Sequence, residues 1–190
     1  MHSYRSRGNG VGRAPTRFGA SPFVQRLAPK IAEAAGSAPI LDVACGSGRN
    51  AFLLAEMGCE VICIDKDLSA IRENSEREHL SPAAKSRIRT YSLDLIGQRW
   101  PFGKAMAGGI INVHFFLPTL LNVFARSLLP GAYLLIETIP GCGGNYLSLP
   151  RAGEVRKQLD STFELTVYKE SKVGPECVDA VTTKVLARRK

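Results

Sequence analysis

The sequence predicts an α/β domain in which one seven-stranded, mostly parallel sheet lies between two layers of helices. Short apolar runs and segments with helical spacing alternate five times along the chain, which is typical of parallel strands joined by covering helices. Two segments rich in β-forming residues, 163–170 and 180–186, then follow with Gly174-Pro175 between them as a turn signal. These two segments predict a closing antiparallel hairpin.

The first five strands are expected where short apolar or alternating runs are bounded by turn residues. They lie at 39–44, 61–64, 88–93, 107–113 and 133–136. The helices, expected where apolar residues recur at helical spacing, lie at 22–35, 49–56, 68–80, 117–129 and 154–159. Ser21-Pro22 is a start signal for the first helix, whereas Ser81-Pro82 is expected to end the third helix and Pro130-Gly131 the fourth.

The 190 residues are expected to form a single domain over 18–190, preceded by a flexible basic arm over 1–17. The arm contains four arginines and no acid, and it lacks the apolar stretch of a secretory signal. No apolar run elsewhere is long enough to span a bilayer. We therefore expect a cytoplasmic protein with no membrane partner, as a monomer or a weak homodimer.

The formal net charge of +8 is concentrated at the two ends of the chain. Four of the 25 basic residues lie in the arm and three lie at 188–190, while the other 18 nearly balance the 17 acidic residues. A protein that reads duplex nucleic acid normally carries a basic face on its folded domain. Nucleic-acid binding, carried by the terminal segments, is therefore the less favoured hypothesis.

The five cysteines are odd in number and form no C-x-x-C pair. This pattern favours reduced thiols over a disulfide framework or a zinc site, and we expect no metal. Cys59 and Cys63 flank and occupy an apolar strand, so they are expected in the core.

The most informative segment is Ile40–Arg49, an apolar strand that ends in an acid, breaks into a glycine turn and opens a helix. Gly46-x-Gly48-x-x-Ala51 matches the dinucleotide fingerprint G-x-G-x-x-G/A, and Asp65 follows Gly46 by 19 residues. The match alone does not separate NAD from S-adenosylmethionine.

The acid of this segment, Asp42, favours S-adenosylmethionine on electrostatic grounds. A dinucleotide places its doubly charged pyrophosphate at the helix N-terminus, where Asp42 would face it as a like charge. S-adenosylmethionine has no phosphate, and an acid favours its ammonium and sulfonium groups. Its carboxylate can use the N–H groups near Ser47 and Gly48.

Acids also close the second and third expected strands. Asp65 can accept both ribose hydroxyls of an adenosine, while Asp94 can accept the adenine amino group and Leu95 can pack on the ring. Ligands of such sheets bind outside the carboxyl ends of the strands, so Asp42, Asp65 and Asp94 are expected to converge on one crevice. The alternative is that each acid merely caps the following helix or turn.

Leu41–Asn50 resembles the first motif of the class I S-adenosylmethionine-dependent methyltransferases, and Leu129–Ala132 resembles their Leu-x-Pro-Gly-Gly lead-in to the fifth strand. The Cys-Gly-Ser-Gly-Arg-Asn run, Ile136–Thr138 and 146–154 look more particularly like the small tellurite-resistance and thiopurine-type methyltransferases. The chain departs from the motif at Ala44, which replaces the usual first glycine.

The resemblance implies a three-layer, Rossmann-like, seven-stranded sheet with a reversed last strand, and S-adenosylmethionine as the cofactor. The residues that it assigns to the methionine moiety are Asp42, Ala44, Gly46 and Asn50. The residues that it assigns to the ribose and adenine are Asp65, Lys66, Asp94 and Leu95. Gly48 is expected to complete the cofactor turn.

Methyl transfer displaces a thioether from carbon, so the protein mainly aligns the acceptor. The end of the fourth expected strand, 112–116, faces the reactive methyl group in the resembled architecture. His114 is the acid/base candidate because its ordinary pKa is near neutrality, with a packed, backbone-bonded histidine as the alternative. Asn112 is expected to bind the methionine end, and Phe115 and Phe116 either wall an apolar pocket or belong to the core.

Two further segments are expected at the acceptor site. Arg49, beside the glycine turn, can steer an anionic acceptor or bind the cofactor carboxylate, with an exposed helix-start arginine as the alternative. Gly141–Tyr146 is a glycine-rich loop expected over the site as a lid or partial wall. The Asn/Asp-Pro-Pro-Tyr/Phe signature of enzymes that methylate nucleic-acid amino groups is absent from 112–116, which disfavours that chemistry.

The sequence thus predicts an S-adenosylmethionine-dependent methyltransferase for a small acceptor such as a thiol, a chalcogen oxyanion, a hydroxyl or an amine. One alternative is an RNA or protein methyltransferase that grips its substrate with the basic arm. Another is a non-catalytic S-adenosylmethionine-binding protein. A nicotinamide-dependent enzyme is the least favoured.

Overall fold

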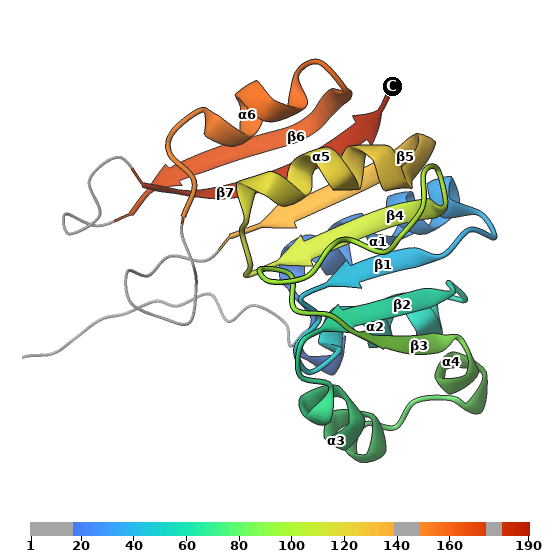
Figure 1. Cartoon of the computed structure of the whole chain (residues 1–190). Coiled ribbons are helices and arrows are strands. Elements are labelled where there is room, and N and C mark those ends of the chain that lie inside the picture. The colour runs from blue at the N-terminus through green and yellow to red at the C-terminus, as the bar shows by residue number, and fades with distance from the viewer. Residues whose placement is uncertain (1–16, 139–148, 174–179) are drawn as a thin grey trace, which may run out of the picture.

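The computed structural model describes residues 17–138, 149–173 and 180–190, and it contains the predicted seven-stranded sheet (Figure 1). The strands are β1 (Ile40–Val43), β2 (Val61–Asp65), β3 (Ile88–Ser92), β4 (Ala107–Val113), β5 (Leu128–Glu137), β6 (Phe163–Lys172) and β7 (Val181–Arg189). Their order across the sheet is β3-β2-β1-β4-β5-β7-β6. β7 pairs antiparallel with both β5 and β6, and the other neighbours pair in parallel, which confirms the closing hairpin.

Helices cover both faces of the sheet, as predicted (Figure 1). They are α1 (Pro22–Ala35), α2 (Arg49–Glu56), α3 (Ser69–Arg77), α4 (Pro82–Ser86), α5 (Pro118–Ser127) and α6 (Glu154–Leu159). α1 and α2 pack on one face against residues such as Ile40 and Ile111, and α5 and α6 pack on the other face with Leu41 and Ile110. Because successive strand residues point to opposite faces, each buried strand contributes to both layers.

The first helix runs from the carboxyl edge of the sheet to the opposite edge. Its N-cap residue, Ser21, hydrogen-bonds Glu137 at the end of β5. At the other end of the helix, a methyl group built on Gly108 of β4 would lie only 2.7 Å from Cα of Ala35. Glycine at this position therefore allows the helix to approach the sheet closely.

Two predicted boundaries are wrong. Ser81-Pro82 begins α4 instead of ending a single helix over 68–80, because Ser81 Oγ accepts a hydrogen bond from the Ala84 N–H at 3.1 Å and acts as an N-cap. The fourth helix ends at Ser127, and β5 already includes Pro130-Gly131. Proline is tolerated there because the pairing of β5 with β4 is irregular over this stretch.

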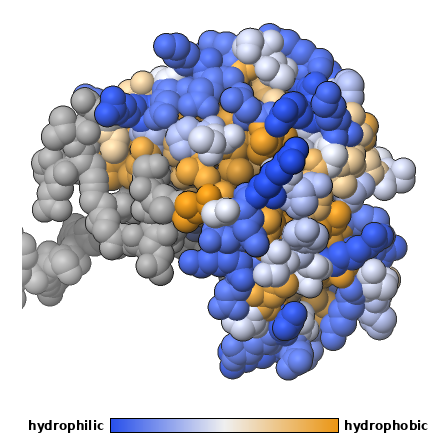
Figure 2. All heavy atoms as spheres, viewed as in Figure 1, coloured by the Kyte–Doolittle hydropathy of each residue, from blue (hydrophilic) through white to orange (hydrophobic). Residues whose placement is uncertain are grey.

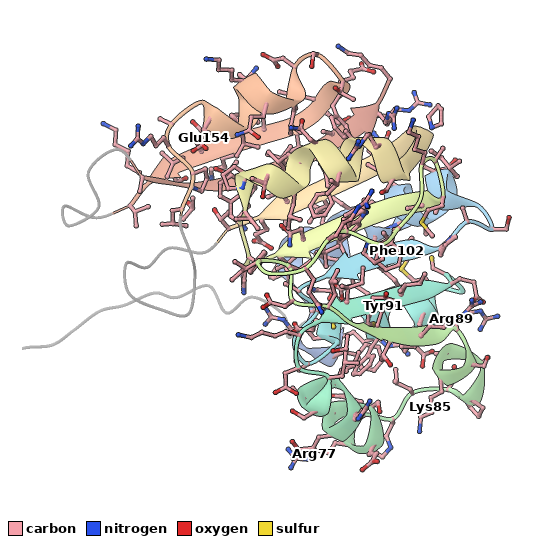
Figure 3. All side chains as sticks on the ribbon, in the orientation of Figure 1. Arg77, Lys85, Arg89, Tyr91, Phe102 and Glu154 are labelled. Atoms are coloured by element: carbon pink, nitrogen blue, oxygen red, sulfur yellow. The ribbon has the colours of Figure 1, made fainter. Side chains whose placement is uncertain are left out.

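An aromatic loop, and no helix, connects β3 to β4. The Phe102 ring lies 5.3 Å from the Tyr91 ring and 5.0 Å from the Trp100 ring, measured between centroids. Figure 3 labels Phe102 and Tyr91. Trp100 Nε1 donates a hydrogen bond to Ser127 Oγ at 2.9 Å. These contacts pack the loop against β3 and the end of α5.

The basic residues at the end of the chain belong to the folded domain. Arg188 and Arg189 lie in β7 and donate hydrogen bonds to the carbonyl oxygens of Gly131 and Leu128 at 3.2 and 3.0 Å. They are therefore part of the folded sheet and not a free basic tail. The arm is outside the described residues apart from its last position.

No helix in the described ranges is long and apolar enough to cross a membrane. Figure 2 shows hydrophilic residues over most of one face, with hydrophobic residues gathered along its middle. Cys59 and Cys63 are buried, as predicted for core residues.

Candidate functional site

The site is built where β1 and β4 end, at the carboxyl edge of the sheet. After β1, the backbone of Ala44, Gly46 and Gly48 takes positive φ values of 56°, 53° and 76°. The Cys45 N–H donates to the Ile64 carbonyl oxygen of β2 at 3.0 Å, and the Gly48 N–H donates to the Cys45 carbonyl oxygen at 3.0 Å. The turn therefore bends sharply, remains tied to β2 and leads directly into α2.

Ala44 occupies a left-handed backbone conformation that alanine tolerates poorly. Ala44→Gly is expected to raise the free energy of unfolding by about 1 kcal/mol, because relief of the Cβ strain outweighs the larger unfolded-state entropy of glycine. Chemical denaturation of the two proteins measures the difference. A lower midpoint for the glycine variant would show that contacts of the alanine methyl group outweigh the strain.

Two adjoining cavities open at this edge and share Ala44 and Phe115 in their walls. The acidic cavity, of about 350 Å³, lies at the ends of β2 and β3 and is lined by Ala44, Asp65, Lys66, Leu93, Asp94, Leu95, Ile96 and Phe115. The turn cavity, of about 280 Å³, lies between the glycine turn and the end of β4. It is lined by Ala44, Cys45, Gly46, Ser47, Arg49, Asn50, Val113, His114 and Phe115.

Eight of the eleven predicted site residues line these two cavities. They are Ala44, Gly46, Asn50, Asp65, Lys66, Asp94, Leu95 and His114. The other three, Asp42, Gly48 and Asn112, are buried and line neither cavity. The expected convergence of three strand-end acids is therefore found for Asp65 and Asp94 but not for Asp42.

The two acids of the acidic cavity also hold the local backbone. Asp65 accepts hydrogen bonds from the Gly46 N–H at 2.9 Å and the Asp67 N–H at 3.2 Å. Asp94 Oδ1 accepts the Ile96 N–H at 3.0 Å. Both acids therefore also cap local turns, which was the alternative hypothesis. Because each carboxylate oxygen has two lone pairs, these backbone hydrogen bonds leave acceptor capacity that faces the cavity.

Asp42 lies beneath the glycine turn and is 1% exposed. Burial raises the pKa of Asp42 to about 7. A hydrogen bond from the Ala51 backbone and the charge of Arg49 lower this pKa, and the charge of Asp65 raises it. Its Oδ2 has no hydrogen-bond partner within the described ranges. Asp42 therefore acts on the site electrostatically from below the turn, and its side chain forms no part of the cavity wall.

Asn112 and Gly48 have structural contacts. The Asn112 side-chain NH₂ donates to the Val43 carbonyl oxygen at 3.0 Å, which joins the ends of β4 and β1. A methyl group on Gly48 would lie 2.6 Å from Cγ1 of Ile71 and 3.0 Å from Cε1 of Phe52. Both residues position the turn from outside the cavities.

His114 follows β4 with a positive φ of 65°, and its N–H donates to the Glu137 carbonyl oxygen at 2.6 Å. Its ring lines the turn cavity, and Nδ1 lies 3.0 Å from Nη2 of Arg49. Burial, and then the Arg49 charge, lower its pKa below 6.5, while Glu137 raises it and Lys184 lowers it. The histidine is therefore neutral at pH 7.

Sequence reasoning missed a polar network behind His114. The buried Glu137 carboxylate accepts hydrogen bonds from the Ser21 hydroxyl and the Lys184 ammonium group. The Ser21 N–H donates to Asn50 Oδ1 at 2.9 Å. The acid at the end of the fifth strand was visible in the sequence, but its partners lie 116 and 47 residues away and had no local signal.

The two phenylalanines after His114 have different places. Phe116 is buried in the core, whereas Phe115 is half-buried and lines both cavities. The predicted loop Gly141–Tyr146 lies outside the described residues. Across the described ranges, no group of three or more His, Cys, Asp or Glu side chains is arranged to hold a metal ion.

Residues 40–131 match a family model described as a methyltransferase domain. The chain is 32% identical over 99 residues to the ribosomal protein L11 methyltransferase of Campylobacter concisus (strain 13826), which covers 52% of this chain and 34% of that protein. The chain thus spans about a third of the length of this curated relative.

Similar folds occur among solved structures. TehB from Haemophilus influenzae has a TM-score of 0.64 at 19% identity, covering 86% of this chain and 61% of that chain. The 1,6-didemethyltoxoflavin-N1-methyltransferase of Burkholderia thailandensis has a TM-score of 0.57 at 17% identity, covering 89% and 79%. At these identities the similarity shows the shared fold.

Proposed function

We propose that this chain, which belongs to the class I S-adenosylmethionine-dependent methyltransferase family, transfers a methyl group from S-adenosylmethionine to a small molecule. The observation that carries the proposal is the pair of adjoining cavities. The acidic cavity, at the ends of β2 and β3, contains two aspartates, whereas no described Asp or Glu lines the turn cavity. When bound, the cofactor supplies an electrophilic methyl group together with its own leaving group.

The acidic cavity fits an adenosine. A ribose diol and an adenine amino group are hydrogen-bond donors, and Asp65 and Asp94 supply acceptors at the ends of adjacent strands. Leu95 and Phe115 supply apolar surface for a ring. We assign the ribose to Asp65, the adenine to Asp94, Leu95 and Lys66, and the methionine moiety to the turn cavity.

Asp42 supports S-adenosylmethionine over a dinucleotide. Its buried carboxyl group, whose pKa is about 7, lies under the turn; a pyrophosphate there would oppose its ionisation, whereas a cationic sulfonium or ammonium would favour it. With the methionine moiety against the glycine turn, the opposite wall of the turn cavity, at Val113, His114 and Phe115, is left for a small acceptor.

Isothermal titration calorimetry with S-adenosylmethionine, S-adenosylhomocysteine and NAD tests the proposal. We expect both sulfur compounds to bind and NAD not to bind. An acceptor screen that measures release of S-adenosylhomocysteine then tests methyl transfer. Binding of the cofactor without release of this product across the screen would favour a non-catalytic S-adenosylmethionine-binding protein.

Asp65→Ala is expected to weaken S-adenosylmethionine binding by about 1–3 kcal/mol, or roughly 5- to 150-fold, because hydrogen bonds to the ribose are lost. Calorimetry of the variant measures the change in Kd. Asp67→Ala is the matched control, since this exposed neighbour does not line the acidic cavity. An affinity equal to that of the unmodified protein would remove Asp65 from the cofactor site.

A protein or RNA acceptor is the second candidate, favoured by the similarity to a ribosomal-protein methyltransferase. Under this hypothesis the arginines of the N-terminal arm grip the substrate. Deletion of residues 1–16 would then abolish salt-sensitive binding to RNA or to a ribosomal protein. The small-molecule proposal expects this deletion to leave cofactor binding and small-acceptor turnover unchanged.

A further inference from the structure

A third cavity, here called the α3 cavity, lies on the α2 face of the sheet at the end where β3 is the edge strand. Its volume is about 200 Å³, and it is lined by Phe52, Ile71, Arg72, Ser75, Leu80, Lys85, Ile88 and Thr90. None of these residues lines the acidic cavity or the turn cavity. The α3 cavity is therefore separate from the space assigned to the cofactor and the methyl acceptor.

The cavity exists because α3 brings little apolar surface to the sheet. Ile71 is the single buried side chain of this nine-residue helix. α3 ends at Arg77 and α4 begins at Pro82, so the chain passes round the space at the β3 end of the sheet (Figure 1). Ile88 and Thr90, two positions apart on β3, point to the same face of the sheet and into this space. The edge strand is thus left partly uncovered.

The wall of the α3 cavity is apolar inside and positively charged at its rim. Phe52, Ile71 and Leu80 are buried, whereas Arg72 and Lys85 are exposed. No described Asp or Glu lines the cavity. Within the described ranges, neither of the two cations takes part in an ion pair. An apolar interior beside two such cations suits a ligand that has an apolar body and an anionic head.

The same wall supports the glycine turn of the cofactor site. A methyl group built on Gly48 would lie 2.6 Å from Cγ1 of Ile71 and 3.0 Å from Cε1 of Phe52. The side-chain nitrogen of Asn74, on α3, donates a hydrogen bond to the Ser47 carbonyl oxygen at 2.9 Å. A ligand in the α3 cavity therefore touches the two side chains on which the turn rests, and it touches a helix that is tied to that turn.

We propose that the α3 cavity binds a small amphipathic anion, and that the bound anion strengthens S-adenosylmethionine binding by holding α3 against the glycine turn. The apolar chain of the anion packs on Phe52, Ile71 and Leu80, and its head binds Arg72 and Lys85. At about 30 Å³ for each water-sized group, the cavity takes roughly seven such groups, which is close to the size of hexanoate. The binding site stands on its own, whereas its effect on the cofactor rests on the proposed function.

Titration of the isotope-labelled protein with hexanoate, followed by two-dimensional NMR, tests the site. We expect chemical-shift changes centred on residues 71–90 and a Kd of about 0.1–5 mM. We expect 1-hexanol to bind at least about fivefold more weakly and hexylamine not to bind, because neither supplies an anion. Shift changes centred on the acidic cavity or the turn cavity, no changes at all, or equal affinities for hexanoate and 1-hexanol would overturn the proposal.

Two matched double substitutions test the cations. Arg72→Gln with Lys85→Gln removes both rim charges and is expected to weaken hexanoate binding about tenfold or more. Arg77→Gln with Arg89→Gln removes as much charge from neighbouring positions that do not line the cavity, where each arginine pairs with a glutamate. Figure 3 labels Lys85 and both control positions. Equal weakening in the two double variants would show a general effect of charge and contradict the site.

Ser75→Leu tests the cavity itself. The larger side chain occupies part of the space, so it is expected to abolish hexanoate binding while both cations remain. Thermal denaturation checks that the variant is folded. Binding of hexanoate to the folded variant with an unchanged Kd would place the ligand elsewhere and overturn the proposal.

Calorimetry of S-adenosylmethionine with and without saturating hexanoate tests the link to the cofactor. We expect hexanoate to lower the Kd of S-adenosylmethionine at least about threefold, and the cofactor to lower the Kd of hexanoate by the same factor. Asn74→Ala removes the hydrogen bond to Ser47 and is expected to bring this factor towards one while hexanoate still binds. A cofactor Kd unchanged by hexanoate overturns the link alone. Absence of cofactor binding in both conditions overturns the proposed function and the link, while the hexanoate titration still decides the site.

Discussion

Asp42→Asn is expected to make the protein progressively more stable, relative to the unmodified chain, as the pH rises from 4 to 8. Burial raises the pKa of Asp42 from 3.8 to about 7, so between these values the folded protein holds a proton that the unfolded chain has released. Stability from this group is complete below pH 3.8 and is lost as the pH rises through 7. A pKa shift of this size corresponds to a fall of about 4 kcal/mol in the free energy of unfolding over this pH range, and the asparagine variant would not show that fall.

Urea denaturation of both proteins at intervals between pH 4 and 8 measures this difference. The comparison isolates Asp42, because His114, whose lowered pKa destabilises the folded state below pH 6.5, is common to both proteins. Asp67→Asn is the matched control at an exposed position. A difference between the two proteins that does not change with pH would show that Asp42 titrates normally.

The same group links stability to cofactor binding. A cationic ligand in the turn cavity favours the ionised form of Asp42 beneath it, so S-adenosylmethionine binding near pH 7 is expected to release a proton. Calorimetry in buffers of different ionisation enthalpy detects that proton, and Asp42→Asn should abolish the release. Asp42 therefore has a role in binding that does not require it to line the cavity.

Gly48→Ala is expected to lower the free energy of unfolding by about 2–5 kcal/mol. The left-handed backbone at φ 76° costs an alanine about 1–2 kcal/mol, and the added methyl group would lie 2.6 Å from Cγ1 of Ile71, whose buried side chain has little room to move. The overpacking contributes a further 1–3 kcal/mol or so. Thermal and chemical denaturation both report the loss.

Gly46→Ala separates the two contributions. Gly46 has a similar φ of 53°, but no atom lies within 4 Å of a methyl group built on it. Its replacement is therefore expected to cost only the backbone strain of about 1–2 kcal/mol. Equal losses for the two variants would mean that Ile71 and the rest of α3 move aside, and the close packing of the turn would then be unimportant.

The fold and much of the site were predictable because their signals are local. Apolar periodicity identified the strands and their covering helices, and an acid after a strand placed Asp65 and Asp94 at one edge of the sheet. Helix boundaries were less predictable, since a Ser-Pro pair can follow the end of one helix or cap the start of the next, and Ser81-Pro82 does the second while α3 already ends at Arg77.

The sequence by itself determined the class of fold, the glycine turn and the strand-end acids, since the alternation of side chains along strands depends on neighbours in the chain. Only the tertiary structure decided which of these residues reach a cavity. It buried Asp42 below the turn and brought Arg49 to His114 across 65 residues. Burial and charge partners shift the pKa values of Asp42 and His114, and both shifts depend on contacts that form only when the sheet assembles.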